Sequence, residues 1–251
     1  MHSHHDKKMP AGARILVAED NPVNLEVALR ILEKLGYAAD PARDGQEAID
    51  RHCAAAYDLV LMDCEMPGVD GYQATQRIRA MEGAARHTPI IALSAGDEER
   101  ERCLSVGMDA FLQKPLRPQI LADVLARWLP SPAIGDAVSM DAGKDELATV
   151  RRMFGADFAE LSALYRTDTP LRIATLRQAH ANGNLAQLAS VAHVLSGSSM
   201  SIGATELSAL CRELELHAKA GSLGNTASRL VVIEAEYLRI SSKLQSLLDE
   251  D

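Results

Sequence analysis

Asp63 is a carboxylate placed at the end of an apolar run of strand length, Leu59 to Met62. A Pro-Gly and an Asp-Gly turn follow it, within residues 67–71. In an open α/β sheet, such a position lies at the rim where ligands bind. A carboxylate there can act as a nucleophile or hold a cation, so Asp63 is the first candidate for chemistry.

His193 is the second candidate, within Ala192-His-Val-Leu-Ser-Gly-Ser-Ser199. The pattern predicts a helix, and at about 100° per residue His193 points away from the apolar stripe of residues 185–195. Its neighbours three and four positions away are small: Ala189, Ser190, Ser196 and Gly197. We therefore expect an exposed imidazole with room for another protein. The chain thus offers two candidate phosphoryl acceptors, an aspartate and a histidine.

Other polar residues follow other apolar runs. Five short apolar runs alternate with five segments of helical period before residue 130, which predicts a doubly wound, five-stranded parallel sheet of the α/β class. Since the carboxyl ends of parallel strands share one edge, we expect Asp63 to lie close to the residues that end the other runs: Glu19, Asp20, Ser94 and Lys114.

Three carboxylates at one edge repel each other, and a hard divalent cation relieves this repulsion. Mg²⁺ prefers a few carboxylates together with water and substrate oxygens. Beside it, an ammonium group and a hydroxyl would complete a site for phosphoryl transfer, with Asp63 attacking phosphorus while Lys114 and Ser94 stabilise the oxygens.

Residues 13–129 resemble a response-regulator receiver domain, which has a flavodoxin-like fold. The resemblance is carried by Ala18-Glu-Asp-Asn-Pro-Val-Asn24, Leu61-Met-Asp-Cys-Glu-Met-Pro-Gly-Val-Asp-Gly71, Ala92-Leu-Ser94 and Lys114-Pro115.

The receiver resemblance implies a role for each residue of the cluster. Asp63 would be phosphorylated, and Phe111 would be an aromatic switch that turns inward as Ser94 moves. Glu19 stands where many receivers have aspartate. The resemblance further implies that Ser94 and Lys114 contact the phosphoryl group, and that Mg²⁺ is held by Asp20, Asp63 and the backbone carbonyl of Glu65, with Glu19 acting through water.

The second half of the chain shows no strand pattern. Residues 1–12 are expected to be a flexible tail and residues 130–139, rich in Pro and Gly, a linker. Apolar stripes then recur at helical spacing within residues 140–251, with short connections between them. They predict an all-α, antiparallel four-helix bundle.

Residues 140–248 resemble a histidine-containing phosphotransfer (HPt) domain. The match is carried by the residues around His193, by Ile202-Gly-Ala204 and by Leu210-Cys-Arg-Glu-Leu-Glu215. It implies that His193 accepts a phosphoryl group and that Gly197 lets a receiver approach closely. The family usually has lysine three residues after the histidine, where this chain has Ser196.

Composition excludes several other classes of function. The 251 residues carry a net charge of −9, and no basic face suited to nucleic acid is present. No apolar run is long enough for membrane insertion, and there is no signal-peptide pattern. Four cysteines lack zinc-type spacing, which is typical of free thiols in a reducing cytoplasm. The N-terminal His-rich tract is expected to be part of the tail.

The two resemblances together predict a two-component phosphorelay protein, similar to the C-terminal part of a hybrid sensor histidine kinase. Its partners would be an upstream histidine kinase and a downstream response-regulator receiver domain. No ATP-binding or DNA-binding region is recognised, so we expect neither kinase activity from this chain alone nor transcription-factor activity. The direction of phosphoryl flow stays open, as does transfer within or between molecules.

Three alternatives remain open. The chain could be a phosphate sink, in which the Asp63 phosphoryl group is hydrolysed, or an interaction scaffold that does not depend on phosphorylation. An aspartate-nucleophile phosphatase is the enzyme alternative. That class needs a second acid two residues after the nucleophile, followed by Thr or Val, whereas Glu65-Met66-Pro67 follows Asp63 here.

Overall fold

The computed structural model describes residues 13–83, 86–96, 99–130, 146–222 and 224–249. Its backbone divides into two compact units, one built around a sheet and one made of helices alone. The predicted tail over residues 1–12 and most of the predicted linker over residues 130–139 lie outside the described residues, so these boundaries stay predictions.

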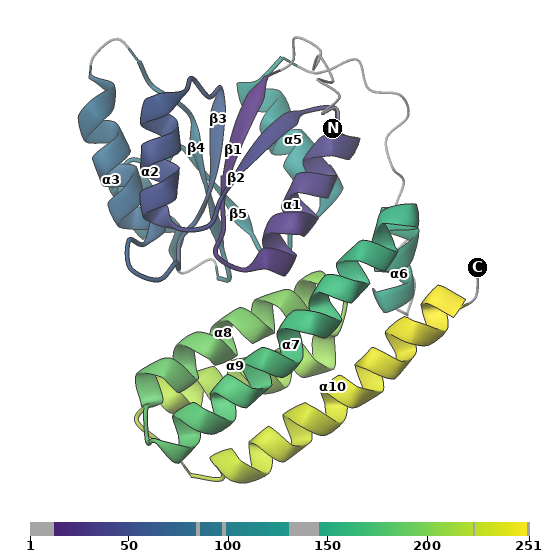
Figure 1. Ribbon diagram of the computed structural model, residues 1–251. Helices are drawn as coiled ribbons and strands as arrows, with labels where there is room; N and C mark the ends of the chain where they lie inside the picture. The colour runs from purple at the N-terminus through teal and green to yellow at the C-terminus, as the bar shows by residue number, and fades with distance from the viewer. Residues whose placement is uncertain (1–12, 84–85, 97–98, 131–145, 223, 250–251) are drawn as a thin grey trace, which may run out of the picture. The chain divides into compact units, whose positions relative to one another are not determined.

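The first unit is a five-stranded sheet in which every neighbouring pair of strands is parallel (Figure 1). The strand order is β2-β1-β3-β4-β5. This confirms the predicted doubly wound α/β fold. Strands alternate with helices along the chain: β1 (Arg14–Ala18), α1 (Pro22–Lys34), β2 (Ala38–Ala42), α2 (Gly45–Ala54), β3 (Leu59–Asp63), α3 (Gly71–Glu82), β4 (Ile90–Ser94), α4 (Arg100–Ser105), β5 (Ala110–Gln113) and α5 (Pro118–Trp128).

Burial explains which strands lie in the middle of the sheet. Every residue of β3 and β4 is buried, and these strands read as nearly continuous apolar runs, as expected for strands covered on both faces. The edge strand β2 contains Pro41, which has no N–H to give to a ladder. Figure 1 shows α2 and α3 on one side of the sheet and α1 and α5 on the other.

The strand order determines where the candidate acidic residues lie in the sheet unit. The chain runs from β1 outwards to β2 and then returns to β3 on the other side of β1. At such a reversal the connections leave in opposite directions and open a crevice at the carboxyl ends of the strands. Glu19 and Asp20 follow β1, and Asp63 is the last residue of β3.

The second unit is a helical bundle. Four long helices were expected, and they are present as α7 to α10, which confirms the fold class of this half. An additional short helix and a 3-10 turn precede them. The elements are α6 (Glu146–Phe154), η2 (Gly155–Asp157), α7 (Phe158–Ala181), α8 (Leu185–Ser201), α9 (Thr205–Lys219) and α10 (Thr226–Asp249).

Three of the largest buried side chains of this bundle are aromatic, within a core that is mostly aliphatic. Tyr165 is fully buried, and its hydroxyl oxygen lies 3.0 Å from Ser199 Oγ, so that the polar end of the ring is satisfied. Phe154, at the end of α6, and Phe158, at the start of α7, are also buried. Helix α6 also packs closely at its start, because a Cβ on Gly203 would come within 2.8 Å of the Glu146 backbone.

Candidate functional site

The structure brings the three acidic candidates of the sheet unit together. The carboxylates of Glu19, Asp20 and Asp63 each have an oxygen within 4.8 Å of the others. Glu19 and Asp63 are buried, and Asp20 is half-buried. Two strand ends are thus sufficient to place three carboxylates in one group, as their positions in the sequence predicted.

Lys114, which follows β5, reaches the same group. Its Nζ lies 2.8 Å from Asp63 Oδ2 and 2.7 Å from Glu19 Oε2. Burial alone would lower the pKa of Lys114, but the two carboxylates outweigh burial and raise it, so the group stays an ammonium. Burial and the neighbouring Glu19 raise the pKa of Asp63, and Lys114 opposes them.

The donor set of this cluster fits a hard divalent cation. Three carboxylates face one ammonium, which leaves an excess of negative charge on oxygen ligands of the kind that Mg²⁺ prefers. The backbone N–H of Glu65 donates to Asp63 Oδ1 at 3.2 Å. This bond fixes the turn after β3, and the ligand role expected for the Glu65 carbonyl stays a prediction.

Ser94 lies on β4, which neighbours β3, and Phe111 lies on β5, which neighbours β4. Ser94 ends β4 next to β3 and is buried, and its hydroxyl donates to a carboxylate oxygen of Glu99. Phe111 in β5 is partly buried. It lines a cavity of about 220 Å³ together with Leu104 and Val124. The structure places both residues on the expected strands, and it does not test their expected roles.

A close contact between the backbone of Gly71 and that of Asp63 holds the end of β3 in position. Gly71 begins α3, and its N–H donates to the Cys64 carbonyl at 3.1 Å. A Cβ at position 71 would lie 2.0 Å from the Asp63 carbonyl oxygen. The last glycine of the motif that contains Asp63 is therefore required by this contact, a role that the sequence analysis did not assign.

In the helical unit, His193 lies on α8 and is paired with a carboxylate from α9. Its Nδ1 lies 3.1 Å from Glu215 Oε1. Burial alone would raise the pKa of Glu215, but hydrogen bonds with His193 and Lys219 outweigh burial and lower it. Glu215 is therefore a carboxylate, which accepts a hydrogen bond from protonated Nδ1 and favours the tautomer in which Nε2 carries the lone pair.

Glu215 and Lys219 were missed as functional residues. Lys219 Nζ lies 2.7 Å from Glu215 Oε1, so the two form an i,i+4 pair on α9. That spacing was visible in the sequence, but the packing of α9 against His193 was not. The expected HPt surface residues, Ser196 and Gly197, lie one turn beyond His193 on α8 and are half-buried.

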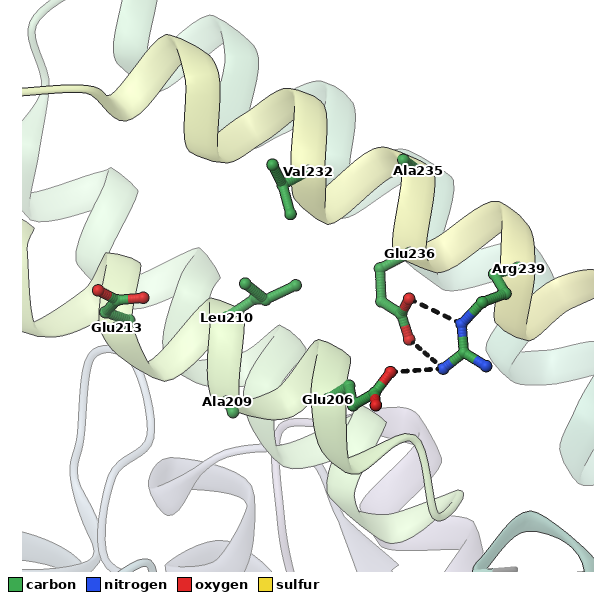
Figure 2. Close-up of a pocket in the computed structure, with 8 residues that line it drawn as sticks. All are labelled: Glu206, Ala209, Leu210, Glu213, Val232, Ala235, Glu236 and Arg239. Carbon is green, nitrogen blue, oxygen red and sulfur yellow. Dashed lines mark hydrogen bonds and ion pairs between the residues drawn. The ribbon is translucent and has the colours of Figure 1, made fainter.

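A groove of about 620 Å³ runs between α9 and α10 (Figure 2). Leu210 and Val232 line it, and Arg239 bridges Glu236 and Glu206 at one end. Neither His193 nor its partner Glu215 lines this groove. The groove is therefore not part of the histidine site.

No helix in the described part of the chain is long and apolar enough to cross a membrane. Each of the four cysteines is a free thiol.

Comparisons with known proteins match both halves. Residues 15–126 match the family described as the response regulator receiver domain, and residues 160–247 match the Hpt domain. The sensor protein GacS of Pseudomonas syringae pv. syringae is 31% identical over 245 residues, which is 89% of this chain and 27% of GacS. The hybrid signal transduction protein dokA of Dictyostelium discoideum is 40% identical over 49% of this chain and 7% of dokA. The chain therefore spans a small part of these relatives.

Among solved structures, one similar chain is the receiver domain of the sensor histidine kinase PA1611 from Pseudomonas aeruginosa, with a magnesium ion coordinated in its active site cleft. It is 45% identical with a TM-score of 0.44, and the match covers 47% of this chain and 98% of that one.

Proposed function

Since the chain joins a response-regulator receiver domain to an Hpt domain and is thus a two-component phosphorelay protein, we propose that Asp63 and His193 are its two phosphoryl acceptors. Asp63 receives the group from the phosphohistidine of an upstream histidine kinase. His193 exchanges it with a receiver aspartate, either Asp63 or that of a downstream response regulator.

The observation that carries the proposal is the cluster around Asp63. An aspartate is a useful phosphoryl acceptor only where the negative charge of the incoming group is neutralised. Lys114 lies 2.8 Å from the Asp63 carboxylate, on the side of the strand ends, and supplies one positive charge. Ser94, at the end of the neighbouring strand, has a hydroxyl that would donate to a phosphoryl oxygen on leaving Glu99.

The residues present would also hold Mg²⁺. Asp20 and Asp63 would be direct ligands with the Glu65 carbonyl, and Glu19 would act through water. When bound, the cation would neutralise phosphoryl oxygens. Because Glu19 contacts Lys114 at 2.7 Å, it also holds the ammonium beside Asp63.

The chemistry at the two residues is complementary. An Asp63 carboxylate oxygen attacks phosphorus, the P–N bond to the donor imidazole breaks, and that imidazole keeps the electron pair. In the next transfer, Nε2 of His193 attacks the phosphorus of an acyl phosphate, and the P–O bond breaks to release the carboxylate. Glu215 holds the ring through Nδ1 at 3.1 Å, so that Nε2 is the nucleophile.

We propose that Phe111 is an aromatic switch, whose ring turns inward when Asp63 is phosphorylated and Ser94 moves. It lies between the core of the sheet unit and the cavity lined by α4 and α5, so a movement of Ser94 and β4 would change how its ring packs. We also propose a cytoplasmic location, as is expected for free thiols in a reducing compartment.

The experiment that tests the receiver half is labelling with acetyl phosphate. We expect Mg²⁺-dependent, alkali-labile label in the intact chain and none in Asp63→Asn or in the presence of EDTA. Label that persists in either case would contradict the assignment of Asp63.

Labelling also separates the alternatives. A relay gives alkali-stable label that requires both Asp63 and His193. A phosphate sink instead gives rapid loss of the Asp63 label without transfer, and a scaffold keeps its partner binding in Asp63→Ala and His193→Ala. An aspartate-nucleophile phosphatase would turn over small phosphoesters, which we do not expect.

A further inference from the structure

Helix α8 offers no positive charge beside the acceptor histidine. It contains neither lysine nor arginine, and the position one turn beyond His193 is Ser196. The Ser196 hydroxyl is directed towards α9, where its Oγ lies 3.0 Å from the Ser208 carbonyl oxygen and 3.1 Å from Ser208 Oγ. A neutral hydroxyl held in this way cannot balance the charge of a phosphoryl group at the imidazole.

Lys219 brings a positive charge to the same imidazole from α9. Its Nζ lies 2.7 Å from Glu215 Oε1, and that same oxygen lies 3.1 Å from His193 Nδ1. The ammonium is therefore separated from the ring by one shared oxygen atom. The Glu215 side chain is 9% exposed, whereas that of Lys219 is 52% exposed. Glu215 is therefore held in the packing, whereas Lys219 lies at the surface of α9.

We propose that Lys219 supplies, from α9, the positive charge for phosphoryl transfer at His193 that Ser196 cannot supply from α8. The proposal rests on the proposed function of His193 as an acceptor. As Nε2 attacks phosphorus and the P–O bond breaks, the oxygens of the transferring group carry negative charge. Lys219 forms no covalent bond and moves no proton. It stabilises that charge electrostatically, while Glu215 keeps its bond with Nδ1.

A purely structural role for Lys219 predicts a different result. An exposed i,i+4 ion pair contributes little to folding stability, so the loss of Lys219 should hardly alter unfolding. A structural pair would also leave the transfer rate unchanged. A rate that falls while stability is kept therefore distinguishes the two roles.

The test uses the intact chain with acetyl phosphate, rapid quenching and separate counting of alkali-labile and alkali-stable label. We expect Lys219→Gln to slow the appearance of alkali-stable label by roughly ten-fold, the factor that one lost charge-assisted contact gives when it acts on the transition state. Lys219→Arg should retain most of the rate. Lys243→Gln on α10 is the matched control and should behave like the parent.

A second variant keeps the inference testable if Lys219→Gln also perturbs the helix. Adding Ser196→Lys to Lys219→Gln should restore the rate, because the charge then comes from α8. An unchanged rate in Lys219→Gln, or a slow double variant, would overturn the role of Lys219. Absence of alkali-stable label in the parent, both with acetyl phosphate alone and with an added phosphorylated response regulator, would instead overturn the proposed function of His193, and this inference with it.

Discussion

In the proposed transfer, the hydrogen bond between His193 and Glu215 selects the ring nitrogen that reacts. Replacing Glu215 with alanine removes the acceptor for Nδ1–H, so the ring is no longer held in one tautomer. We expect Glu215→Ala to slow formation of phosphohistidine by roughly ten-fold or more, and Glu215→Gln, which keeps an acceptor oxygen, to slow it less. The measurement is the rate of alkali-stable labelling, together with the ¹⁵N chemical shifts of the imidazole.

The control for Glu215 is Glu213, which lies on the same helix and pairs with Arg229 at 2.7 Å. Glu213→Ala should label at the parent rate. If Glu215→Ala kept both the parent rate and the parent tautomer, the pairing with Nδ1 would have no role in transfer.

Single residues were predictable from the sequence where the fold itself brings them together. Glu19, Asp20 and Asp63 each follow an apolar run, and parallel strands put their carboxyl ends at one edge. Glu215 differs, because its approach to His193 depends on how α8 packs against α9. A periodicity within one helix does not contain that information.

At the scale of elements, the start of α3 holds the end of β3 in place. A Cβ at position 71 would lie 2.0 Å from the Asp63 carbonyl oxygen and 2.9 Å from its carbonyl carbon, and both are backbone atoms. We expect Gly71→Ala to destabilise the sheet unit by about 1–3 kcal/mol, as forced overpacking does, and to impair labelling of Asp63. Urea unfolding and acetyl phosphate labelling measure the two effects.

Gln73 lies in the first turn of the same helix and is exposed, so Gln73→Ala is the control for helix α3. Parent-like stability and labelling in Gly71→Ala would show that the backbone there can shift at little cost.

A buried histidine of α2 contacts the end of α3 and the loop that leads into β4. His52 of α2 has its Nε2 3.0 Å from Thr88 Oγ1 and 3.5 Å from Glu82 Oε1. Burial lowers the pKa of His52, Arg86 and Arg79 add to this effect, and Glu82 opposes it. The folded state therefore binds this proton less readily than the unfolded chain.

The sign of the pH dependence follows from that difference. The contribution of neutral His52 to stability is complete above the unfolded pKa of about 6.5 and is lost as the pH falls below it. We expect the free energy of unfolding to decrease as the pH falls from 7.5 to 5.5. The decrease should be smaller in His52→Gln. Urea titrations at both pH values test this, and an equal decrease in both chains would contradict it.

The presence of the long helices was predicted more accurately than the side chains that those helices bury. Apolar spacing in the sequence favours a buried face on α9 made of Leu207, Leu210, Leu214 and His217. The structure instead buries Leu207, Ser208, Cys211, Leu214, Glu215 and Ala218. Ser208 and Glu215 contact α8, through Ser196 and His193, whereas Leu210 lines the groove towards α10. Contacts with the neighbouring helix, rather than hydropathy alone, therefore decide which face of α9 is buried. Helix α6 was not predicted, although Leu147, Val150 and Phe154 have helical spacing.

At the scale of the whole molecule, the two proposed acceptors lie in one chain, so the rate of any exchange between them would depend on the segment that joins them. Each unit has its own core, with Leu61 and Met62 in one and Tyr165 and Leu195 in the other. Residues 131–145 connect the described parts, and a chain of that length spans at most about 50 Å. Such a tether gives an effective concentration of about 1 mM for one acceptor near the other.

Transfer within the intact chain should therefore not depend on protein concentration. After Asp63 is labelled, a ten-fold dilution should leave the half-time of His193 labelling unchanged. An equimolar mixture of Asp63→Asn and His193→Gln chains can transfer only between molecules, so its labelling of His193 should slow roughly ten-fold on the same dilution. At micromolar concentration the intact chain should also be far faster than the mixture, since the effective concentration of one acceptor for the other in the same chain is about millimolar. If the intact chain instead slowed on dilution as the mixture does, transfer would occur between molecules, and the tether would serve only to keep the two domains in one protein.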